Sequence, residues 1–596
     1  MSKAFKNIRI LLPGISGPGL FREYFLVLAV AVSFLMTFLT LPRIDYIDAD
    51  PLFYFKQLPF PYYLSVITCV VATILGRSRF TRVFSIVTFA LLIEFTPSIM
   101  FVNPWHSDSY GFLAQAVHIA RDGHITHLKD LQESPSLALT FGAQQLLTGV
   151  DPLLLFKIYQ LLVVSIFVLL LYSIAENIVG SGGNAAIASL AFFAILWPIT
   201  FHFNRQNFSI VFYLAAWHLL SKALFVKRDN KTYYLTGFMI FLMVLSHPAT
   251  PLYFVSNLVA VIVLAGLFKR LSHRELKDLL YLILFTLLIW LGWHYYMVPE
   301  AAGLNTIYDL IINFYESLRY GLTEISGSSE IFGGYTSVYS VFVSLRLALS
   351  FLPVVIIFPL LFLVYRFRDN VELSKLSIIL MAWLLSNLSS ALPLLYAGLP
   401  FFYRPVLFAG IAWGPIVALI YGLLINVKGL RTKRILPSRN MSKTLRLPLL
   451  ICFIIIPCLI LPVIKYSALP YLYPTTKELS AKMFLDTHQG RALSAIYLED
   501  NRPWLYTYIL MGVDESGVIM LSSIGENIIG TLRSETLFVT DRLVTRDVFI
   551  HYDPTMYQII ANVSEFTETT HNKVYDAGGY NWILHPEAIL ESIDSE

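Results

Sequence analysis

Apolar stretches long enough to cross a lipid bilayer recur through the first 465 residues, and they constrain this chain more than any other feature. A helix needs roughly 20 predominantly apolar residues to span the hydrocarbon core. Thirteen stretches are predicted to do so, near 24–42, 59–76, 83–102, 152–175, 184–202, 206–226, 233–246, 249–268, 278–298, 341–365, 376–398, 405–426 and 448–465. With 56% hydrophobic and 14% charged residues, the composition excludes an ordinary soluble multidomain protein.

Lys and Arg gather in every second gap between these stretches, and this alternation predicts the topology. Short cytoplasmic loops collect cations, whereas exported loops do not. With a cytoplasmic amino terminus, the cytoplasmic gaps carry 25 of the 43 Lys and Arg residues. The opposite gaps are acidic, and thirteen crossings leave the carboxyl terminus outside. This assignment depends on the break at Ser246-His-Pro. If one of the two spans beside it did not cross the membrane, every later loop would lie on the opposite side.

The charge distribution also predicts two domains. Residues 466–596 contain 8 Lys and Arg against 18 Asp and Glu, although the whole chain has a net charge of +4. We expect this tail to be an extracytoplasmic soluble α/β domain with a helix near 477–487, strands near 495–498 and 518–521, and a hairpin over 573–584. The remainder, 1–465, is the predicted transmembrane domain, an α-helical polytopic fold with external loops at 43–58, 103–151 and 299–340. The cytoplasmic cations are dispersed in short loops, so nucleic acid is not an expected partner.

The external loop 103–151 contains the most informative segment. It reads Trp105-His-Ser-Asp-Ser-Tyr and continues with Leu113, Ala114 and Val117 at helical spacing. This pattern predicts an amphipathic helix along the outer membrane surface, with Asp108 in its first turn at the boundary between lipid and water. A carboxylate there is a candidate catalytic base or metal ligand. The alternative is that Asp108, or Ser107, only caps the helix.

Three motifs resemble the GT-C superfamily of polytopic glycosyltransferases. They are Trp105-His-Ser-Asp-Ser-Tyr with a surface helix ending at Gly123, Ser246-His-Pro-Ala-Thr-Pro, and Tyr403-Arg-Pro. The chain is most similar to archaeal members of the type that includes protein mannosyltransferases and aminoarabinose transferases. The resemblance implies a polyprenyl (dolichyl) phosphate sugar donor, a protein or lipid-linked glycan acceptor, and an acidic residue of an early external loop at the reaction centre.

The position of the acid departs from the family pattern. Family members carry it directly after the first span, whereas Asp108 follows the third predicted span. Either an extra hairpin precedes the core of the family fold, or the acid is Asp48 or Asp50, which do follow the first span. Their hard oxygen ligands also make them candidates for a divalent metal ion.

Cations on the outer side are the candidates for phosphate binding. Glycosyl transfer from a polyprenyl phosphate needs a base for the acceptor's proton and cations that stabilise the departing phosphate. Because the outer loops are depleted of cations, those at outer helix ends need a specific reason, and Arg suits phosphate through its planar fork. The candidates are Lys157, Arg205, Arg346 and Arg404. Snorkelling to lipid headgroups is the alternative for each.

Several other residues are singled out by their position. His247 lies at the Pro-flanked break, where it either contacts substrate or phosphate or caps a helix end. His202 is a further interfacial histidine, and Trp105 and His106 adjoin Asp108. Glu94 falls within the third predicted span, where a carboxylate must pair with a cation or face a cavity. Two sequons, Asn207-Phe-Ser and Asn562-Val-Ser, are open as to glycosylation.

These features predict a multi-pass glycosyltransferase of the cell membrane that acts on the extracytoplasmic face, with membrane lipids as its surroundings. No Gly-rich phosphate loop is present, which disfavours a cytoplasmic nucleotide sugar as donor. Two alternatives stay open. One is a transporter or flippase of a lipid-linked glycan, for which we would expect internal repeats, and the other is a non-catalytic envelope scaffold.

Overall fold

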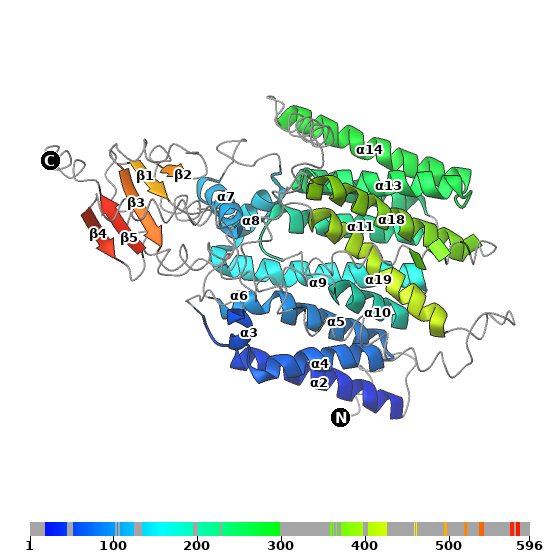
Figure 1. Cartoon of the computed structure of the whole chain (residues 1–596), viewed down its shortest axis with the longest axis horizontal. Coiled ribbons are helices and arrows are strands. Elements are labelled where there is room, and N and C mark those ends of the chain that lie inside the picture. Colours follow the sequence, from blue (N-terminus) through cyan, green and yellow to red (C-terminus); the bar gives the residue numbers. More distant parts are fainter. Residues whose placement is uncertain are drawn as a thin grey trace.

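The structure is a computed structural model, and it shows a body of long helices packed side by side (Figure 1). It describes residues 18–44, 52–101, 104, 108–123, 134–180, 182–194, 201–226, 229–297, 371–396 and 403–425, seven isolated positions between 358 and 461, and five strands between 494 and 584.

Eleven of the thirteen predicted apolar stretches coincide with described helices. These helices are α2 (Pro18–Thr40), α4 (Phe60–Leu75), α5 (Arg79–Glu94), α9 (Pro152–Val179), α10 (Gly182–Ala194), α11 (Arg205–Phe225), α12 (Asn230–Ser246), α13 (Thr250–Leu267), α14 (His273–Met297), α18 (Val371–Tyr396) and α19 (Tyr403–Ile425). The stretches 341–365 and 448–465 lie outside the described residues apart from isolated positions. Within the described part, five helices are long and apolar enough to cross a membrane, namely Gly19–Thr40, Pro152–Val179, Arg205–Phe225, Thr250–Leu267 and His273–His294.

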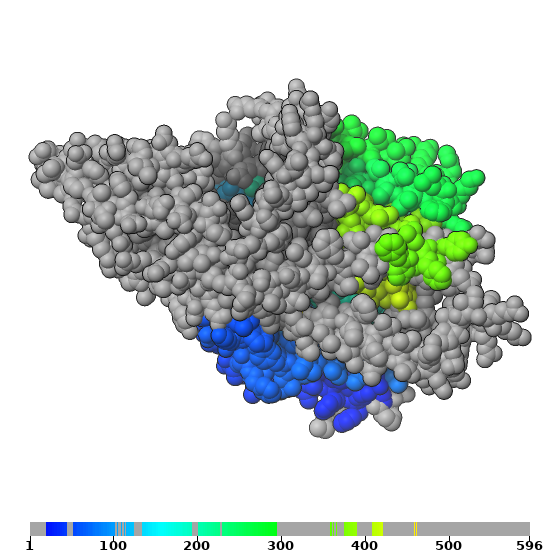
Figure 2. Space-filling view, in the orientation of Figure 1, coloured from blue at the N-terminus to red at the C-terminus, as the bar shows by residue number. Residues whose placement is uncertain are grey.

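Exposed apolar side chains form stripes on these helices. On α2 the exposed residues recur every three or four positions: Phe21, Phe25, Leu28, Val32, Leu35 and Leu39. On α14 the same period links Leu280, Leu284, Leu288 and Leu291. Figure 2 shows the space-filling surface, with α14 and α18 at one edge and the amino-terminal helices at the opposite edge. Continuous apolar stripes of this length suit lipid rather than water, and they indicate a multi-pass membrane protein.

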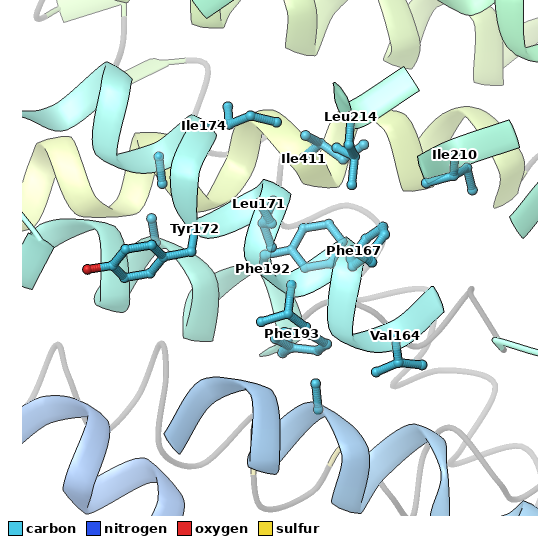
Figure 3. Packing of buried hydrophobic residues seen from close by; sticks show 14 of the residues in the cluster. Val164, Phe167, Leu171, Tyr172, Ile174, Phe192, Phe193, Ile210, Leu214 and Ile411 are labelled. Atoms are coloured by element: carbon cyan, nitrogen blue, oxygen red, sulfur yellow. The ribbon is translucent and has the colours of Figure 1, made fainter. Parts of the chain in front are cut away.

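The core lies where α9, α10, α11 and α19 meet (Figure 3). The Phe167 ring packs edge-on against Phe201 at 4.7 Å between centroids and lies 5.5 Å from Phe192. At the crossing of α19 with α10, a Cβ atom on Gly414 would lie 2.3 Å from the carbonyl oxygen of Ala188. Only a glycine lets the two backbones approach this closely.

Polar contacts collect at the cation-rich ends of the helices. Glu23 at the start of α2 accepts hydrogen bonds from the backbone N–H groups of Arg77 and Ser78, at 2.9 and 3.0 Å, and so caps α5. Arg79 pairs with Glu176 near the end of α9 at 2.9 Å. These contacts bring two of the predicted basic gaps, and the gap after α9, to one end of the body.

A second cluster of polar contacts at this end shows in which directions the helices around Ser246-His-Pro run. Lys375 at the start of α18 pairs with Glu275 at the start of α14, at 2.6 Å, and donates to the carbonyl oxygen of Leu224 at the end of α11. Because α11 ends where α14 begins, α12 and α13 must run in opposite directions between them. The break therefore reverses the chain, as predicted. Which side of the membrane this end faces stays a prediction.

The third predicted span is shorter than expected. Helix α5 ends at Glu94, and a separate short helix, α6 (Thr96–Met100), carries Pro97 in its first turn. A proline lacks the backbone N–H that would continue α5 and its ring clashes with the preceding turn. After α6, Phe101 forms a parallel bridge with Ile44, and the N–H of Ile44 donates to the carbonyl oxygen of Met100 at 2.8 Å.

Five strands lie in the carboxyl-terminal segment, beyond the end of the helical body (Figure 1). They are β1 (Ser494–Tyr497), β2 (Val518–Met520), β3 (Thr536–Asp541), β4 (Asn572–Asp576) and β5 (Tyr580–Leu584), in the sheet order β2-β1-β3-β5-β4. Strand β1 is parallel to β2 and β3, whereas β5 is antiparallel to β3 and β4. The helix predicted at 477–487 lies outside the described residues, so the α/β character of this domain and its boundary at 466 stay predictions.

Candidate functional site

Helix α7 (Asp108–Asp122) begins at the residue that the sequence singles out as the candidate base. It packs against α8 (Ser136–Thr148), which lies beside it at one end of the helical body (Figure 1). Leu113, Ala116 and Val117 of α7 are buried. This finding differs from the predicted amphipathic helix with its apolar face in lipid, because protein covers these apolar residues.

The crossing of α7 and α8 depends on Gly142. A Cβ atom at this position would lie 2.8 Å from Cγ2 of Ile119 and 3.0 Å from the carbonyl oxygen of Ala116, both on α7. Any larger residue would push the two helices apart. The position of α7, and with it the backbone of Asp108, therefore rests on close packing rather than on the membrane surface.

Phe112 of α7 contacts one candidate site residue, Arg205, and lies one helical turn after another, Asp108. Arg205 opens α11, and its guanidinium carbon lies 4.7 Å from the centroid of the Phe112 ring. Phe112 follows Asp108 by four residues on α7, so the two positions share one face of the helix. The face of α7 that begins with Asp108 is thus turned toward the first residue of α11.

A closed set of hydrogen bonds shapes the loop that precedes Arg205. Asn204 Oδ1 accepts from the N–H of Asn207 at 2.7 Å, so its amide nitrogen is the group that donates to Nε2 of His202, also at 2.7 Å. Asn207 in turn donates to the carbonyl oxygen of His202 at 2.9 Å. His202 is buried and, as the acceptor, carries no proton on Nε2. These bonds show a structural role for His202 in holding the start of α11.

The sequon at Asn207 is not available for glycosylation in the folded chain. The Asn207 side chain is 3% exposed and its amide is engaged with His202, while Ser209 is fully buried and donates to the carbonyl oxygen of Met243. Asn562 lies outside the described residues.

Lys157 and Arg43 form a second group of cations. Lys157 lies near the start of α9, where Asp151 caps the helix by accepting from the N–H groups of Leu153 and Leu154. Lys157 is half-buried, and the positive charge of Arg43, just after α2, acts on it. Among the described residues neither cation forms an ion pair. Sequence reasoning missed Arg43, although the depletion of outer cations that singled out Lys157 applies to it equally.

A parallel bridge joins Ile44 and Phe101, the residues that directly precede the two segments with candidate acids. One segment, with Asp48 and Asp50, starts directly after Ile44, and the other, with Trp105 and His106, starts directly after Phe101. The chain therefore runs in the same direction at Ile44 and at Phe101, which lie next to each other. The four site residues of these segments lie outside the described residues. No group of three His, Cys, Asp or Glu side chains able to hold a metal ion occurs among the described residues.

His247 caps a helix. Its Nδ1 accepts from the backbone N–H of Thr250 at 3.3 Å and lies 3.0 Å from the Thr250 hydroxyl, at the start of α13. The turn is also held by Trp290, whose indole N–H donates to the carbonyl oxygen of Pro248 at 2.8 Å. The capping alternative for His247 is thus present in the structure. Of the remaining cations, Arg404 occupies the first turn of α19, and Arg346 lies outside the described residues.

Glu94 is the last residue of α5. Its side chain is fully buried, and Oε2 accepts from the backbone N–H of Phe201 at 3.3 Å. The sequence predicted that Glu94 would pair with a cation or face a cavity. It did not predict that the backbone amide of a distant loop would donate to the carboxylate.

Comparisons with known proteins point to one fold. No family model matches the chain, and no curated protein matches its sequence. Among solved structures, the oligosaccharyltransferase of Archaeoglobus fulgidus in the apo form is 11% identical, with a TM-score of 0.50 over 83% of this chain and 71% of that chain. The same protein tethered with an acceptor peptide containing the NVT sequon is 12% identical, with a TM-score of 0.48 over 85% and 74%. ArnT from Cupriavidus metallidurans bound to undecaprenyl phosphate is 11% identical, with a TM-score of 0.45 over 84% and 97%.

The likeness to the apo oligosaccharyltransferase shows the fold. The chain shares the helical fold of that oligosaccharyltransferase, and the fold implied by the resemblance of its sequence motifs is confirmed. A shared fold does not establish an activity, which must be argued from the site.

Proposed function

We propose that this chain is a membrane glycosyltransferase that transfers a sugar from a polyprenyl phosphate carrier to a protein or lipid-linked glycan acceptor. The observation that carries the proposal is the placement of Arg205 over Phe112, one helical turn after Asp108 on the same face of α7. A carboxylate position and a cation thus share one side of the helical body, in a chain with a GT-C fold. This is the pair of charges that the reaction requires.

In the proposed reaction the Asp108 carboxylate accepts the proton of the acceptor's nucleophile. The nucleophile forms a bond to the anomeric carbon of the sugar as the bond from that carbon to the carrier's phosphate oxygen breaks. The phosphate leaves with the electron pair, and its charge is stabilised by Arg205 and by Lys157 with Arg43. Arg346 and Arg404 are proposed to contribute to the same phosphate.

The aromatic and imidazole groups have proposed roles in binding. Trp105 and His106 adjoin the proposed base and would contact the sugar. In neutral His247, Nδ1 faces Thr250, which leaves the proton on Nε2 as a donor to the phosphate. Asp48 and Asp50 are the candidate ligands of a divalent metal ion, and they are the alternative acids should Asp108 prove dispensable.

The proposed topology places this chemistry outside the cell. The cation-rich helix ends and the amino terminus face the cytoplasm, and α7, α8 and the carboxyl-terminal domain face outward. The family resemblance favours the cell membrane of an archaeon.

The test compares purified full-length protein in lipid nanodiscs with two variants of α7. Radiolabelled polyprenyl phosphate sugars are supplied as donors, and a membrane extract supplies acceptors. We expect Asp108→Asn to lower transfer by at least about 100-fold, because general base catalysis contributes on the order of 10² to 10⁴.

The matched control is Asp122→Asn at the other end of the same helix, where the carboxylate pairs with Arg121 and His118. It should retain transfer within about threefold. Equal transfer by wild type and Asp108→Asn would remove Asp108 from the mechanism and direct attention to Asp48 and Asp50. Movement of the carrier across the bilayer without bond formation would instead favour a flippase.

A further inference from the structure

A buried polar cluster joins the segments that carry the proposed site. It consists of the side chains of Glu94, Ser98 and Gln160 and the backbone N–H of Phe201. All three side chains are 1% exposed or less. None of them belongs to the proposed catalytic groups, so the cluster has no role in the reaction described above.

The hydrogen bonds of the cluster run between three segments that are distant in sequence. Gln160 of α9 donates through Nε2 to the carbonyl oxygen of Glu94 at 2.8 Å, and its Oε1 accepts from the hydroxyl of Ser98 in α6. The carboxylate of Glu94 accepts from Phe201 at 3.3 Å. The end of α5, the start of α9 and the loop before α11 are thus tied to one another at a single point.

Each of these segments leads within a few residues to a candidate site residue. Phe201 precedes Arg205 by four residues, and Gln160 follows Lys157 by three. On the third segment, α6 ends beside Phe101, seven residues before Asp108. The cluster lies at the convergence of the cation-bearing and acid-bearing segments.

We propose that Glu94 and Gln160 are positioning residues, which hold the loop before Arg205 and helix α6, which precedes Asp108 in the chain, at a fixed separation. The proposal rests on the proposed function for what is positioned, but the hydrogen bonds are tested without any assay of activity. Glu94 contacts no substrate in this account. A buried carboxylate is costly unless its oxygens are hydrogen-bonded, so its presence here needs a reason.

A fourth segment packs at the same place. Tyr54 of α3 (Phe53–Gln57) stacks on Phe101, with 6.3 Å between centroids. Burial raises the pKa of Tyr54 well above its usual value, and the charge of Glu94 acts in the same direction. Tyr54 is therefore neutral, and the segment that follows Asp48 and Asp50 ends within the electrostatic reach of Glu94.

The chain supplies a matched control at the opposite end of the helical body. Glu23 is also fully buried, and its carboxylate also accepts backbone N–H groups, those of Arg77 and Ser78. Removing either carboxylate should disturb local packing to a similar extent. Only the removal of Glu94 should disturb the proposed site.

The test is hydrogen–deuterium exchange of full-length protein in nanodiscs, for Glu94→Ala, Glu94→Gln and Glu23→Ala. In Glu94→Ala we expect peptides covering 201–207 to exchange at least about tenfold faster, because the amide of Phe201 loses its acceptor. Glu94→Gln keeps an acceptor oxygen and should restore protection. Glu23→Ala should accelerate exchange only near residues 77–81.

Transfer activity is then measured on the same samples. We expect kcat/KM of Glu94→Ala to fall roughly 10- to 100-fold, since small misplacements of reacting groups have effects of this size, with recovery in Glu94→Gln and no change in Glu23→Ala. Unchanged protection at 201–207 in Glu94→Ala overturns the inference. So does full activity after protection is lost. If the wild type shows no transfer, the proposed function fails, while the exchange result still decides whether Glu94 holds the loop.

Discussion

The guanidinium group of Arg205 lies over the ring of Phe112, 4.7 Å from its centroid, and this contact joins the first residue of α11 to α7. The chain between the two helices passes through α8, α9 and α10, so the contact joins segments that are distant in sequence. Arg205 is held from one side by this ring and from the other by the hydrogen-bonded turn of His202, Asn204 and Asn207.

Replacement of Phe112 by Leu should weaken the proposed phosphate binding by Arg205. A cation over an aromatic face gains about 0.5–2 kcal/mol, so we expect the KM for the donor to rise by roughly 2- to 30-fold, with a smaller change in kcat. Steady-state kinetics with a varied polyprenyl phosphate sugar would measure both. The control is Phe80→Leu at the cation-rich end, where the ring stacks on Phe84. An equal rise of KM in the two variants would contradict the role of the contact.

Removal of the positive charges of Arg43 and Lys157 should weaken the binding of polyprenyl phosphate. The double variant Arg43→Gln with Lys157→Gln should bind polyprenyl phosphate at least about tenfold more weakly, because hydrogen bonds to charged groups contribute on the order of 1.5–3 kcal/mol. Wild-type binding should also weaken as salt is added, and less so in the variant. Microscale thermophoresis with a fluorescent polyprenyl phosphate would measure the affinity.

Two comparisons make this test specific. Arg121→Gln removes an exposed cation that pairs with Asp122, and it should leave the affinity unchanged. A polyprenol without phosphate should bind wild type and double variant alike. If phosphatidylglycerol competes as well as the carrier does, the two cations bind any lipid phosphate. An unchanged affinity of the double variant for the carrier would rule out the site.

The sequence predicted those parts of the site that depend on local pattern. The helix that starts at Asp108, the cation that opens α11 and the reversal at His247 all follow from apolar periodicity and from residues next to them in the chain. Helix α5 was predicted too long because apolar residues continue beyond Glu94, although Pro97 lies among them. The two spans and the helix of the tail that lie outside the described residues stay predictions.

Other parts could not be read from local pattern, because they depend on contacts between distant segments. Glu94 and Phe201 are 107 residues apart, and no feature of either segment indicates the other. The burial of Asn207 is a similar case, since its sequon reads like any exposed one. The pairing of Ile44 with Phe101 is a tertiary contact too, and no local pattern indicates that these two positions, four and seven residues before Asp48 and Asp108, lie side by side.

Gly142→Ala should lower transfer more than it lowers stability. The added methyl would lie 2.8 Å from Ile119 and 3.0 Å from the backbone of Ala116, so α7 must shift to make room. We expect kcat/KM to fall about tenfold, because displacement of the Asp108 backbone misplaces the base, with a midpoint of thermal unfolding close to that of wild type. Gly292→Ala in α14, where the methyl meets nothing within 4 Å, should leave kcat/KM unchanged. A normal kcat/KM for Gly142→Ala would show that the position of α7 does not limit the reaction.

Gly414→Ala should destabilise the helical body, and the sign of the effect can be checked against a second glycine. At position 414 a Cβ atom would lie 2.3 Å from the carbonyl oxygen of Ala188, and because both groups belong to helix backbones, α19 and α10 must separate. Overpacking of this kind costs about 1–3 kcal/mol. In Gly266→Ala the methyl enters open space in α13, where alanine favours the helix by about 0.5–1 kcal/mol. Thermal unfolding in detergent should therefore move to lower temperature for Gly414→Ala and slightly higher for Gly266→Ala. The same direction of shift in both variants would contradict the close approach of α10 and α19.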